Sequence, residues 1–296
     1  MGRFENKVVI VTGSSNGIGQ ATLLDFAKEG ANVVLHGLNQ DRIKETENLL
    51  QKAGISASQY LVVKGPVQEE ATVQALINEP LKKWGKIDIL VNNAGLGFKS
   101  GHELYSIENF DYVFAVNVRA RLRLIELAIP HLQKTKGNTV GVSSTGAFRK
   151  PIDHPLHTFY STASAAFDHY MRNDTARLKN LQIDHPLHTF YSTASAAFDH
   201  YMRNDTARLA SLGIRINNVN PGPTITGIFT HDGSNKTEVD AGLSVYEKLS
   251  RNAVLPGGAE PSEVSRIILF LADEQSKSIT GASYYIDRGL STYAPA

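Results

Sequence analysis

Short apolar runs rich in β-branched residues recur along this chain, and amphipathic stretches lie between them. The runs are Val8–Val11, Val33–Leu35, Leu61–Val63, Ile87–Val91 and Ile214–Val219. Continuous apolar runs of this length are typical of strands covered on both faces, as in a parallel sheet. The stretches 17–30, 39–54 and 68–84 predict helices, and one face of a further helix carries Val264, Ile267, Ile268 and Leu271. Alternating strands and helices require right-handed crossovers, so we predict an α/β fold with a doubly wound parallel sheet.

One segment of the chain occurs twice. Residues 152–178 and 183–209 both have the sequence IDHPLHTFYSTASAAFDHYMRNDTARL. In the first copy one helical face carries Ala163, Ala166, Phe167, Tyr170 and Met171, while Asp168, Arg172 and Arg177 lie elsewhere, which predicts an amphipathic helix. Two units do not make a solenoid, which needs at least about three stacked repeats. We therefore expect a single domain over residues 1–296 that contains a tandem repeat.

Composition and charge exclude several classes of protein. Thirty basic and 29 acidic residues give a net charge of +1, with no long run of either sign. We therefore expect neither a nucleic-acid partner nor a membrane surface. The absence of cysteine excludes disulfides and thiolate metal sites. The chain opens without a charged and then apolar leader, and no apolar run approaches the roughly 18 residues of a membrane span, so we expect a soluble cytoplasmic protein.

A glycine-rich turn directly follows the first predicted strand and opens a helix. Its sequence at residues 12–19 is TGSSNGIG. Glycines permit a tight turn and close approach of a pyrophosphate, and the helix N-terminus supplies free amides with a partial positive charge. A plain turn between strand and helix can have the same composition. The strand before it, the helix after it and the alternating pattern favour a dinucleotide site.

From this turn onward the chain resembles the short-chain dehydrogenase/reductase family. TGSSNGIG resembles the family's TGxxxGIG, NNAG at 92–95 resembles its NNAG, and YSTAS in each repeat resembles its YxxxK. Pro221-Gly222 resembles the PG turn beside the nicotinamide, and ITG at 279–281 resembles the closing ITG…VDGG, with Arg288 in place of one glycine. The resemblance covers essentially the whole chain apart from one repeat unit, and it implies a single NAD(P)-binding Rossmann domain.

What the resemblance implies is an NAD(P)-dependent oxidoreductase that transfers hydride between the nicotinamide and a small-molecule carbonyl or secondary alcohol. Ser144 would hold the substrate oxygen, Tyr160 or Tyr191 would give or take its proton, and Asn117 would support a water relay. A homodimer or homotetramer is the expected assembly. The implied cofactor-binding residues are Gly13, Ser15, Asn16, Gly17, Ile18, Gly19, Leu38, Val67, Asn93, Ala94, Gly95, Pro221, Gly222, Thr224 and Thr226.

The lysine of YxxxK is replaced by serine in both copies, as Ser164 and Ser195. A free tyrosine titrates near 10, and the family's lysine lowers that value and grips the nicotinamide ribose. A neutral hydroxyl does neither, so we expect an impaired enzyme that favours carbonyl reduction, with serine-to-lysine substitution restoring rate. Two alternatives stay open: the serine merely lies on an exposed helix face, or the protein is a catalytically silent dinucleotide-binding or scaffold protein.

Two tyrosines therefore compete for one site. Tyr160 follows Ser144 at a plausible loop length, whereas Tyr191 precedes Pro221 by enough residues for one helix and one strand. Loop-closure entropy grows only slowly with length and forbids neither arrangement. We favour the first copy, because docking the second would place the extra residues beside the substrate cleft. Exchange of the spare helix between protomers is a third arrangement.

Other positions bear on the cofactor, metal and substrate. Gly37 stands where an NAD-selective site would carry an acid, and Leu38 and Asn16 stand where an NADP-selective site would carry basic residues. Arg42 could reach a 2′-phosphate, and the absence of the acid favours NADP. Pro66 replaces an aspartate that the family commonly places against the adenine. We expect no metal at the two HPLH motifs, at 154–157 and 185–188, and a mobile lid over the substrate at 224–255.

Overall fold

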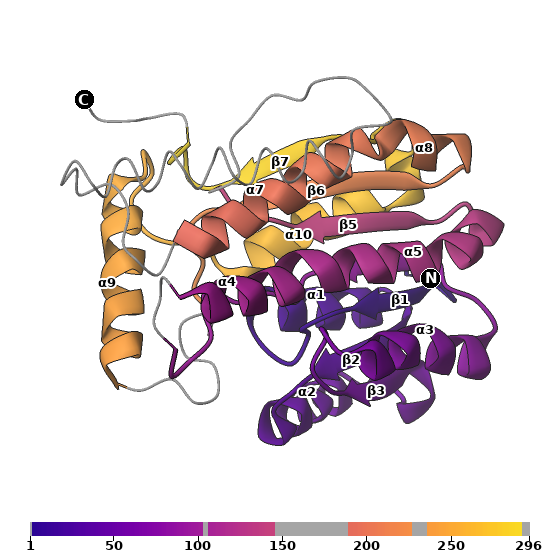
Figure 1. The fold of residues 1–296 in the computed structure, drawn as a ribbon. Helices are drawn as coiled ribbons and strands as arrows, with labels where there is room; N and C mark the ends of the chain where they lie inside the picture. Colours follow the sequence, from indigo (N-terminus) through magenta and orange to yellow (C-terminus); the bar gives the residue numbers. More distant parts are fainter. Residues whose placement is uncertain (1, 103–105, 146–188, 227–235, 292–296) are drawn as a thin grey trace.

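Seven parallel strands form one sheet at the centre of the protein (Figure 1). The computed structural model describes residues 2–102, 106–145, 189–226 and 236–291. The strand order is β3-β2-β1-β4-β5-β6-β7, and each neighbouring pair is parallel, so the predicted doubly wound sheet is confirmed. The strands are β1 (Val8–Val11), β2 (Asn32–Gly37), β3 (Tyr60–Lys64), β4 (Ile89–Asn92), β5 (Asn138–Val142), β6 (Arg215–Pro221) and β7 (Ser283–Ile286).

Helices cover both faces of this sheet, and two apolar clusters fill the space between the layers. One cluster joins the sheet to α1 (Gly17–Lys28), α2 (Gln40–Lys52) and α10 (Pro261–Ala272). The other joins it to α3 (Glu70–Trp84), α5 (Ala120–Thr135), α7 (Thr189–Asn204) and α8 (Thr206–Ser211). The helix α4 (Ile107–Phe114) leads through a π-helical turn, η2 (Ala115–Arg119), into α5, whereas α9 (Lys236–Asn252) stands apart from the sheet (Figure 1). Short 3₁₀ turns are η1 (Ala57–Gln59) and η5 (Glu274–Ser276).

Two strands lie outside the apolar runs of the sequence, β5 and β7. β5 has the sequence NTVGV, yet all five residues are buried. The amide nitrogen of its polar residue Asn138 has a non-local partner, because Asn138 Nδ2 donates to the carbonyl of Leu271 at 2.7 Å. At Gly141 a Cβ would lie 2.7 Å from Phe198, so the bare backbone of β5 lets α7 approach closely. Tertiary contacts, and not local apolarity, therefore make this segment a central strand.

The helix beside β5 is the second copy of the repeat. Its apolar face, formed by Ala194, Ala197, Phe198, Tyr201 and Met202, is buried as the helical pattern predicts. Asp199 lies at the position that the pattern assigned to the polar side, yet it is fully buried. There its Oδ1 accepts hydrogen bonds from Asn218 (2.9 Å), Asn220 (3.2 Å) and Ser283 (3.1 Å).

We predicted that the first copy of the repeat would occupy the site. This prediction is wrong, because the helix that packs on β5 is α7, which belongs to the second copy. Gly213 has φ +74° and lets the chain turn from α8 into β6, where the Ile214 amide bonds to the Leu209 carbonyl at 3.0 Å. The corresponding residue after the first copy is Gln182, whose side chain disfavours this left-handed conformation. The second copy thus carries the correct turn into the sheet, while the longer connection before it has a small entropic cost. Residues 146–188, which include the first copy, lie outside the described residues.

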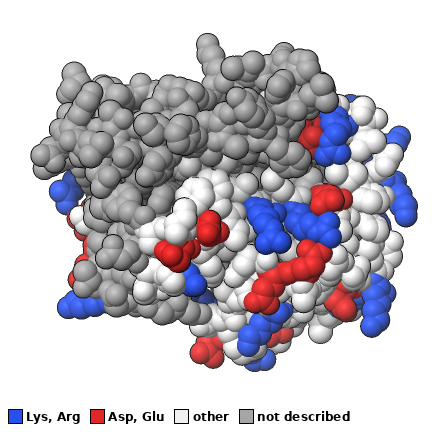
Figure 2. All heavy atoms as spheres, viewed as in Figure 1, with Lys and Arg blue, Asp and Glu red and all other residues white. Residues whose placement is uncertain are grey.

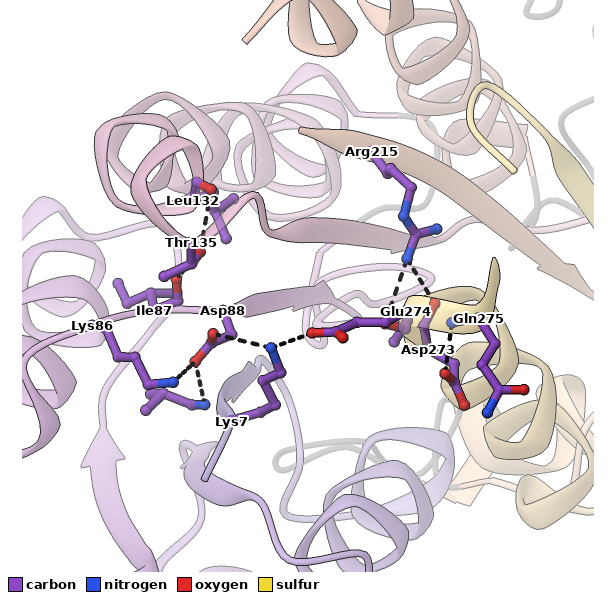
Figure 3. A network of polar contacts seen from close by, with 12 residues as sticks. Lys7, Lys86, Ile87, Asp88, Leu132, Thr135, Arg215, Asp273, Glu274 and Gln275 are labelled. Atoms are coloured by element: carbon purple, nitrogen blue, oxygen red, sulfur yellow. Dashed lines mark hydrogen bonds and ion pairs between the residues drawn. The ribbon is translucent and has the colours of Figure 1, made fainter. Parts of the chain in front are cut away.

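The edge of the sheet where the strands begin is held by charged side chains (Figure 3). Asp88 is 5% exposed and accepts from the Val8 amide at 2.8 Å, which ties the start of β4 to the start of β1. Lys86 pairs with the same carboxylate at 3.0 Å, and Lys7 bridges it to Glu274. This network lies at the opposite edge from the glycine-rich turn, so its role is structural.

Positive and negative side chains lie intermixed on the described part of the face shown in Figure 2. Arg123 pairs with Glu70 at 2.7 Å and with Glu126 at 2.9 Å, linking α5 to α3. Such exposed pairs contribute little stability.

Candidate active site

The glycine-rich turn lies where β1 runs into α1, next to the end of β4, at the point where the strand order reverses. Gly13 and Gly17 have φ angles of +64° and +56°. A Cβ at Gly19 would lie 2.4 Å from the Gly13 carbonyl oxygen, so this close crossing excludes side chains. Asn16 caps α1 without a side-chain bond, and the first turn of the helix carries no acid. The amides at this helix N-terminus are thus open to an anionic group, and the cradle fits a pyrophosphate.

The turn is tied to the NNAG segment after β4. Thr12 Oγ1 accepts from the amides of Asn93 (3.0 Å) and Ala94 (2.9 Å), and Asn93 Nδ2 donates to the carbonyls of Thr12 (2.9 Å) and Gly13 (3.2 Å). A Cβ at Gly13 would lie 2.9 Å from Ala94 Cα. Two motifs that are about eighty residues apart in the chain therefore form one rigid wall of the site.

His36, at the end of β2, supports the same turn and was not singled out from the sequence. Its Nδ1 accepts from the Gly13 amide at 2.9 Å, so its Nε2 carries the proton and donates to the Gly65 carbonyl at 3.0 Å. The ring is 3% exposed, and burial lowers its pKa from 6.5 to about 4, although the bond to Gly65 opposes the shift. The signal in the sequence is only a histidine inside an apolar strand, which does not reveal a partner on another strand.

Ser144 and Tyr191 come together from β5 and α7. Ser144 lies two residues after β5 and is 8% exposed, and its backbone carbonyl accepts from Asn220 Nδ2 at 2.9 Å. The hydroxyls of Ser144 and Tyr191 are hydrogen-bonded to each other, as the two would be in the site that the sequence implies. Burial raises the pKa of Tyr191, while the bonds from Ser144 and Ser195 and the charge of Arg121 oppose the shift. Tyr160, the competing tyrosine, lies outside the described residues.

Ser195 is 4% exposed, so its interpretation as a residue of an exposed helix face is wrong. It lies one turn after Tyr191, with its hydroxyl bonded to that tyrosine. Its carbonyl accepts from Ser143 Oγ at 3.0 Å, which fixes α7 against the end of β5. Position 195 thus faces Tyr191.

Asn117 lies in the π-helical turn η2 and is 2% exposed. Its side chain binds both backbone groups of Leu96, with Oδ1 accepting from the amide at 3.0 Å and Nδ2 donating to the carbonyl at 2.8 Å. It therefore anchors the segment that follows NNAG. π-helical turns are frequent at functional positions, and this one contains Asn117.

The remaining predicted positions surround the same edge of the sheet. The Pro221 carbonyl accepts from the Thr145 amide at 3.1 Å, and a Cβ at Gly17 would lie 3.0 Å from Thr226. Leu38 is 53% exposed just beyond β2, and Val67 is buried.

Ser15 lies against Gly37, where a Cβ would be 2.4 Å from Ser15 Oγ, and Ile18 packs on the core. Ser164 and both HPLH motifs lie outside the described residues, as does part of the predicted lid, at 227–235.

A glycine-rich cradle at the switch point of a doubly wound sheet, with a hydroxyl pair beside it, defines a dinucleotide-dependent enzyme of the Rossmann class. The chain belongs to the short-chain dehydrogenase family. The sequence model of that family, described as short chain dehydrogenase, matches residues 7–185, and one described as Enoyl-(Acyl carrier protein) reductase matches residues 180–291. The protein is therefore an NAD(P)-dependent short-chain dehydrogenase/reductase. Within the described residues no helix is long and apolar enough to cross a membrane.

Individual relatives are similar over almost their whole length. A glucose 1-dehydrogenase of Gluconobacter oxydans is 31% identical over 292 residues, which cover 98% of this chain and 94% of the relative. A short-chain dehydrogenase/reductase of unknown function from Caenorhabditis elegans, solved with cofactor, is 32% identical with a TM-score of 0.80, covering 99% of this chain and 97% of that one. The glucose dehydrogenase of the same organism in its apo form is also 32% identical, with a TM-score of 0.70 and coverage of 98% and 100%.

Proposed function

We propose that this protein reduces a small-molecule carbonyl, or oxidises the corresponding secondary alcohol, with Ser144 and the second-copy tyrosine, Tyr191, as its catalytic pair. The observation that carries this proposal is the hydrogen bond between their two hydroxyls, at the carboxyl edge of the sheet beside the glycine-rich cradle. The nicotinamide supplies or accepts the hydride when the cofactor is bound. The turn at 12–19 and Asn93 would hold its phosphates and ribose.

In this mechanism Ser144 donates a hydrogen bond to the substrate oxygen and orients it. Tyr191 gives its hydroxyl proton to that oxygen as the carbonyl carbon gains the hydride, and the carbonyl double bond becomes a C–O single bond. The reverse direction needs the tyrosine ionised. Because burial raises the pKa of Tyr191, the protonated form predominates at neutral pH, which favours carbonyl reduction.

We also propose NADP as the preferred cofactor. The end of β2 offers Gly37 and the exposed Leu38 in place of the acid that would bind the ribose hydroxyls. Arg42 lies in the first turn of the next helix, where Asn39 caps α2 by accepting from the Arg42 amide at 2.9 Å. A nicotinamide fluorescence titration tests this: R42A is expected to weaken NADPH binding about tenfold and to change NADH binding little. The matched control K44A, on an exposed position of the same helix, is expected to change neither affinity.

The catalytic assignment is tested with paired tyrosine variants. With saturating NADPH and a panel of ketones and aldehydes, Y191F is expected to reduce turnover by about 10²-fold or more, because the proton donor is lost. Y160F, which alters the identical residue of the first copy, is expected to retain the rate. Loss of activity in Y160F with normal activity in Y191F would overturn the assignment. Cofactor binding without turnover in the unaltered chain would overturn the proposed activity itself.

The implied homodimer or homotetramer is a separate proposal. Sedimentation velocity of the full chain, with and without NADPH, would show it as a species of two or four chain masses.

A further inference from the structure

Arg121 is a buried arginine that the proposed mechanism leaves without a role. It lies on α5, one turn after Asn117, and is 5% exposed. Its Nε and Nη2 donate to the Ala94 carbonyl at 3.0 and 2.8 Å, and its Nη1 donates to the Val142 carbonyl at 2.8 Å. A weaker bond reaches the Asn93 carbonyl at 3.4 Å. The guanidinium therefore lies between the ends of β4 and β5, where its bond to Val142 is two residues before Ser144 in the chain.

Every hydrogen-bond acceptor that the described residues offer this guanidinium is a backbone carbonyl, and none is a carboxylate. A buried charge without a counter-ion is energetically costly, so its retention needs a reason. Burial lowers the pKa of Arg121 to about 10, which still leaves it protonated at neutral pH. Space for it is provided by Gly95, where a Cβ would lie 2.7 Å from Arg121 Nη2.

The charge of Arg121 acts on the helix that carries the tyrosine. Its guanidinium lies 4.7 Å from the ring centroid of Phe198, which is two helical turns after Tyr191 on α7. Tyr191 and Arg121 interact electrostatically in both directions: the cation lowers the pKa of the tyrosine, and the tyrosine raises that of the arginine. Arg121 is the charged group that acts on Tyr191 among the described residues, since Ser144 and Ser195 contribute only neutral hydroxyls.

We propose that Arg121 supplies, from α5, the positive charge beside the Tyr191 hydroxyl that the serine at position 195 of α7 does not supply. This inference rests on the proposed function. In the oxidative direction Tyr191 must accept the alcohol proton as a tyrosinate, and the guanidinium stabilises that anion without giving up its own proton. Arg121 is thus an electrostatic partner that acts through Tyr191. Arg121 supplies a positive charge in place of the lysine, but it does not bind the nicotinamide ribose as that lysine would.

The direct test is a titration of Tyr191 in the cofactor-free protein. Tyrosinate absorbance is measured against pH for the unaltered chain and for R121Q, each minus its Y191F counterpart, so that the difference isolates one tyrosine. R121Q is expected to raise the midpoint by about one pH unit or more, because an opposite charge at close range is removed. R121K, which keeps the charge, is expected to stay near the unaltered value. An unchanged midpoint in R121Q would overturn the proposal whether or not the protein turns over any substrate.

Kinetics supply a second test that does not require R121Q to fold. If Arg121 did not act on Tyr191, the tyrosine would have no positive charge near it, and S195K would then be expected to restore the rate of alcohol oxidation. With the charge of Arg121 already present, S195K is expected to raise kcat for alcohol oxidation by less than about threefold at saturating cofactor, while the KM for the cofactor falls. A tenfold or greater gain in kcat would overturn the proposal.

In the R121Q background the same S195K change is expected to recover about tenfold in oxidation at neutral pH, and to alter reduction much less. Equal gains in both backgrounds would contradict a shared role. A shifted tyrosine titration in a chain without turnover would uphold the charge pairing and refute the proposed function, so the two failures are distinguishable.

Discussion

Protonation of His36 is expected to destabilise the folded protein in mildly acidic solution. The ring is 3% exposed, its Nδ1 accepts from the Gly13 amide, and its Nε2 donates to the Gly65 carbonyl. A second proton on Nδ1 would turn this acceptor into a donor that faces another N–H. The bond under the glycine-rich turn would then be lost, and a charge would be buried.

The magnitude follows from the pKa of the ring. In the unfolded chain the histidine titrates near 6.5, and in the folded protein burial lowers the pKa to about 4. Between these two pH values the unfolded state binds more protons, so stability is full above 6.5 and falls as the pH decreases toward about 4. One pH unit of difference corresponds to about 1.4 kcal/mol, so the total loss from this group is about 3 kcal/mol.

Urea unfolding across this pH range measures the effect, with the fluorescence of Trp84, the one tryptophan, as the signal. H36N keeps an oxygen near the position of Nδ1 but cannot titrate. It is expected to be less stable than the unaltered chain at neutral pH by about 1–3 kcal/mol, because the bond to Gly65 is lost. Its disadvantage should shrink or reverse as the pH falls below 6.5. The control H131Q removes a partly exposed histidine of α5 whose pKa burial also lowers, but by less than that of His36, so its stability difference from the unaltered chain should change less with pH.

Parallel stability curves for the unaltered chain and H36N below pH 6.5 would refute the reasoning about His36. NADPH affinity provides an independent readout, since Gly13 lies in the cofactor cradle. As the pH is lowered, the affinity for NADPH is expected to decrease more steeply in the unaltered chain than in H36N.

Two further predictions concern the docking of α7. D199N is expected to cost about 3–5 kcal/mol in urea unfolding, because Arg203, 2.7 Å from the buried carboxylate, would face an amide with no countercharge. The exposed pair of Glu247 and Arg251 serves as control, and E247Q should lower the free energy of unfolding by at most about 1 kcal/mol. Similar losses of stability in D199N and E247Q would contradict the buried pairing. G213Q, which copies the residue found after the first repeat, is expected to destabilise the protein by about 1–2 kcal/mol, since φ there is +74°. The exposed A210Q on the preceding helix should change stability little, and an unaffected G213Q would show that the turn does not select the second copy.

Much of the architecture follows from local pattern. Residues 8–11 and 33–35 are apolar enough to be central strands in any arrangement, and the helices between them have clear apolar faces. The glycine-rich turn could be located because its neighbours in the chain are also its neighbours in space. NNAG could be placed at the same edge because it follows an apolar run and parallel strands end on one side of a sheet. Ser144 was placed there only by the family resemblance, because β5 carries no apolar run.

The choice between the two tyrosines could not be made in this way. Both copies have the same sequence and therefore the same local preferences, so only the residues that flank each copy can distinguish them. The residue after the second copy is Gly213, and the residue at the same place after the first copy is Gln182. This difference matters only because the chain must turn with a positive φ before it enters β6.

The sequence by itself determined the class of sheet, the cofactor cradle and the absence of lysine four residues after either tyrosine. The tertiary structure decided which copy faces Ser144, that Asp199 is buried, and that His36 and Arg121 meet the turn and the tyrosine. The physical reason is that burial, pKa and charge pairing depend on groups from distant segments, which a local pattern of apolar and polar positions does not specify.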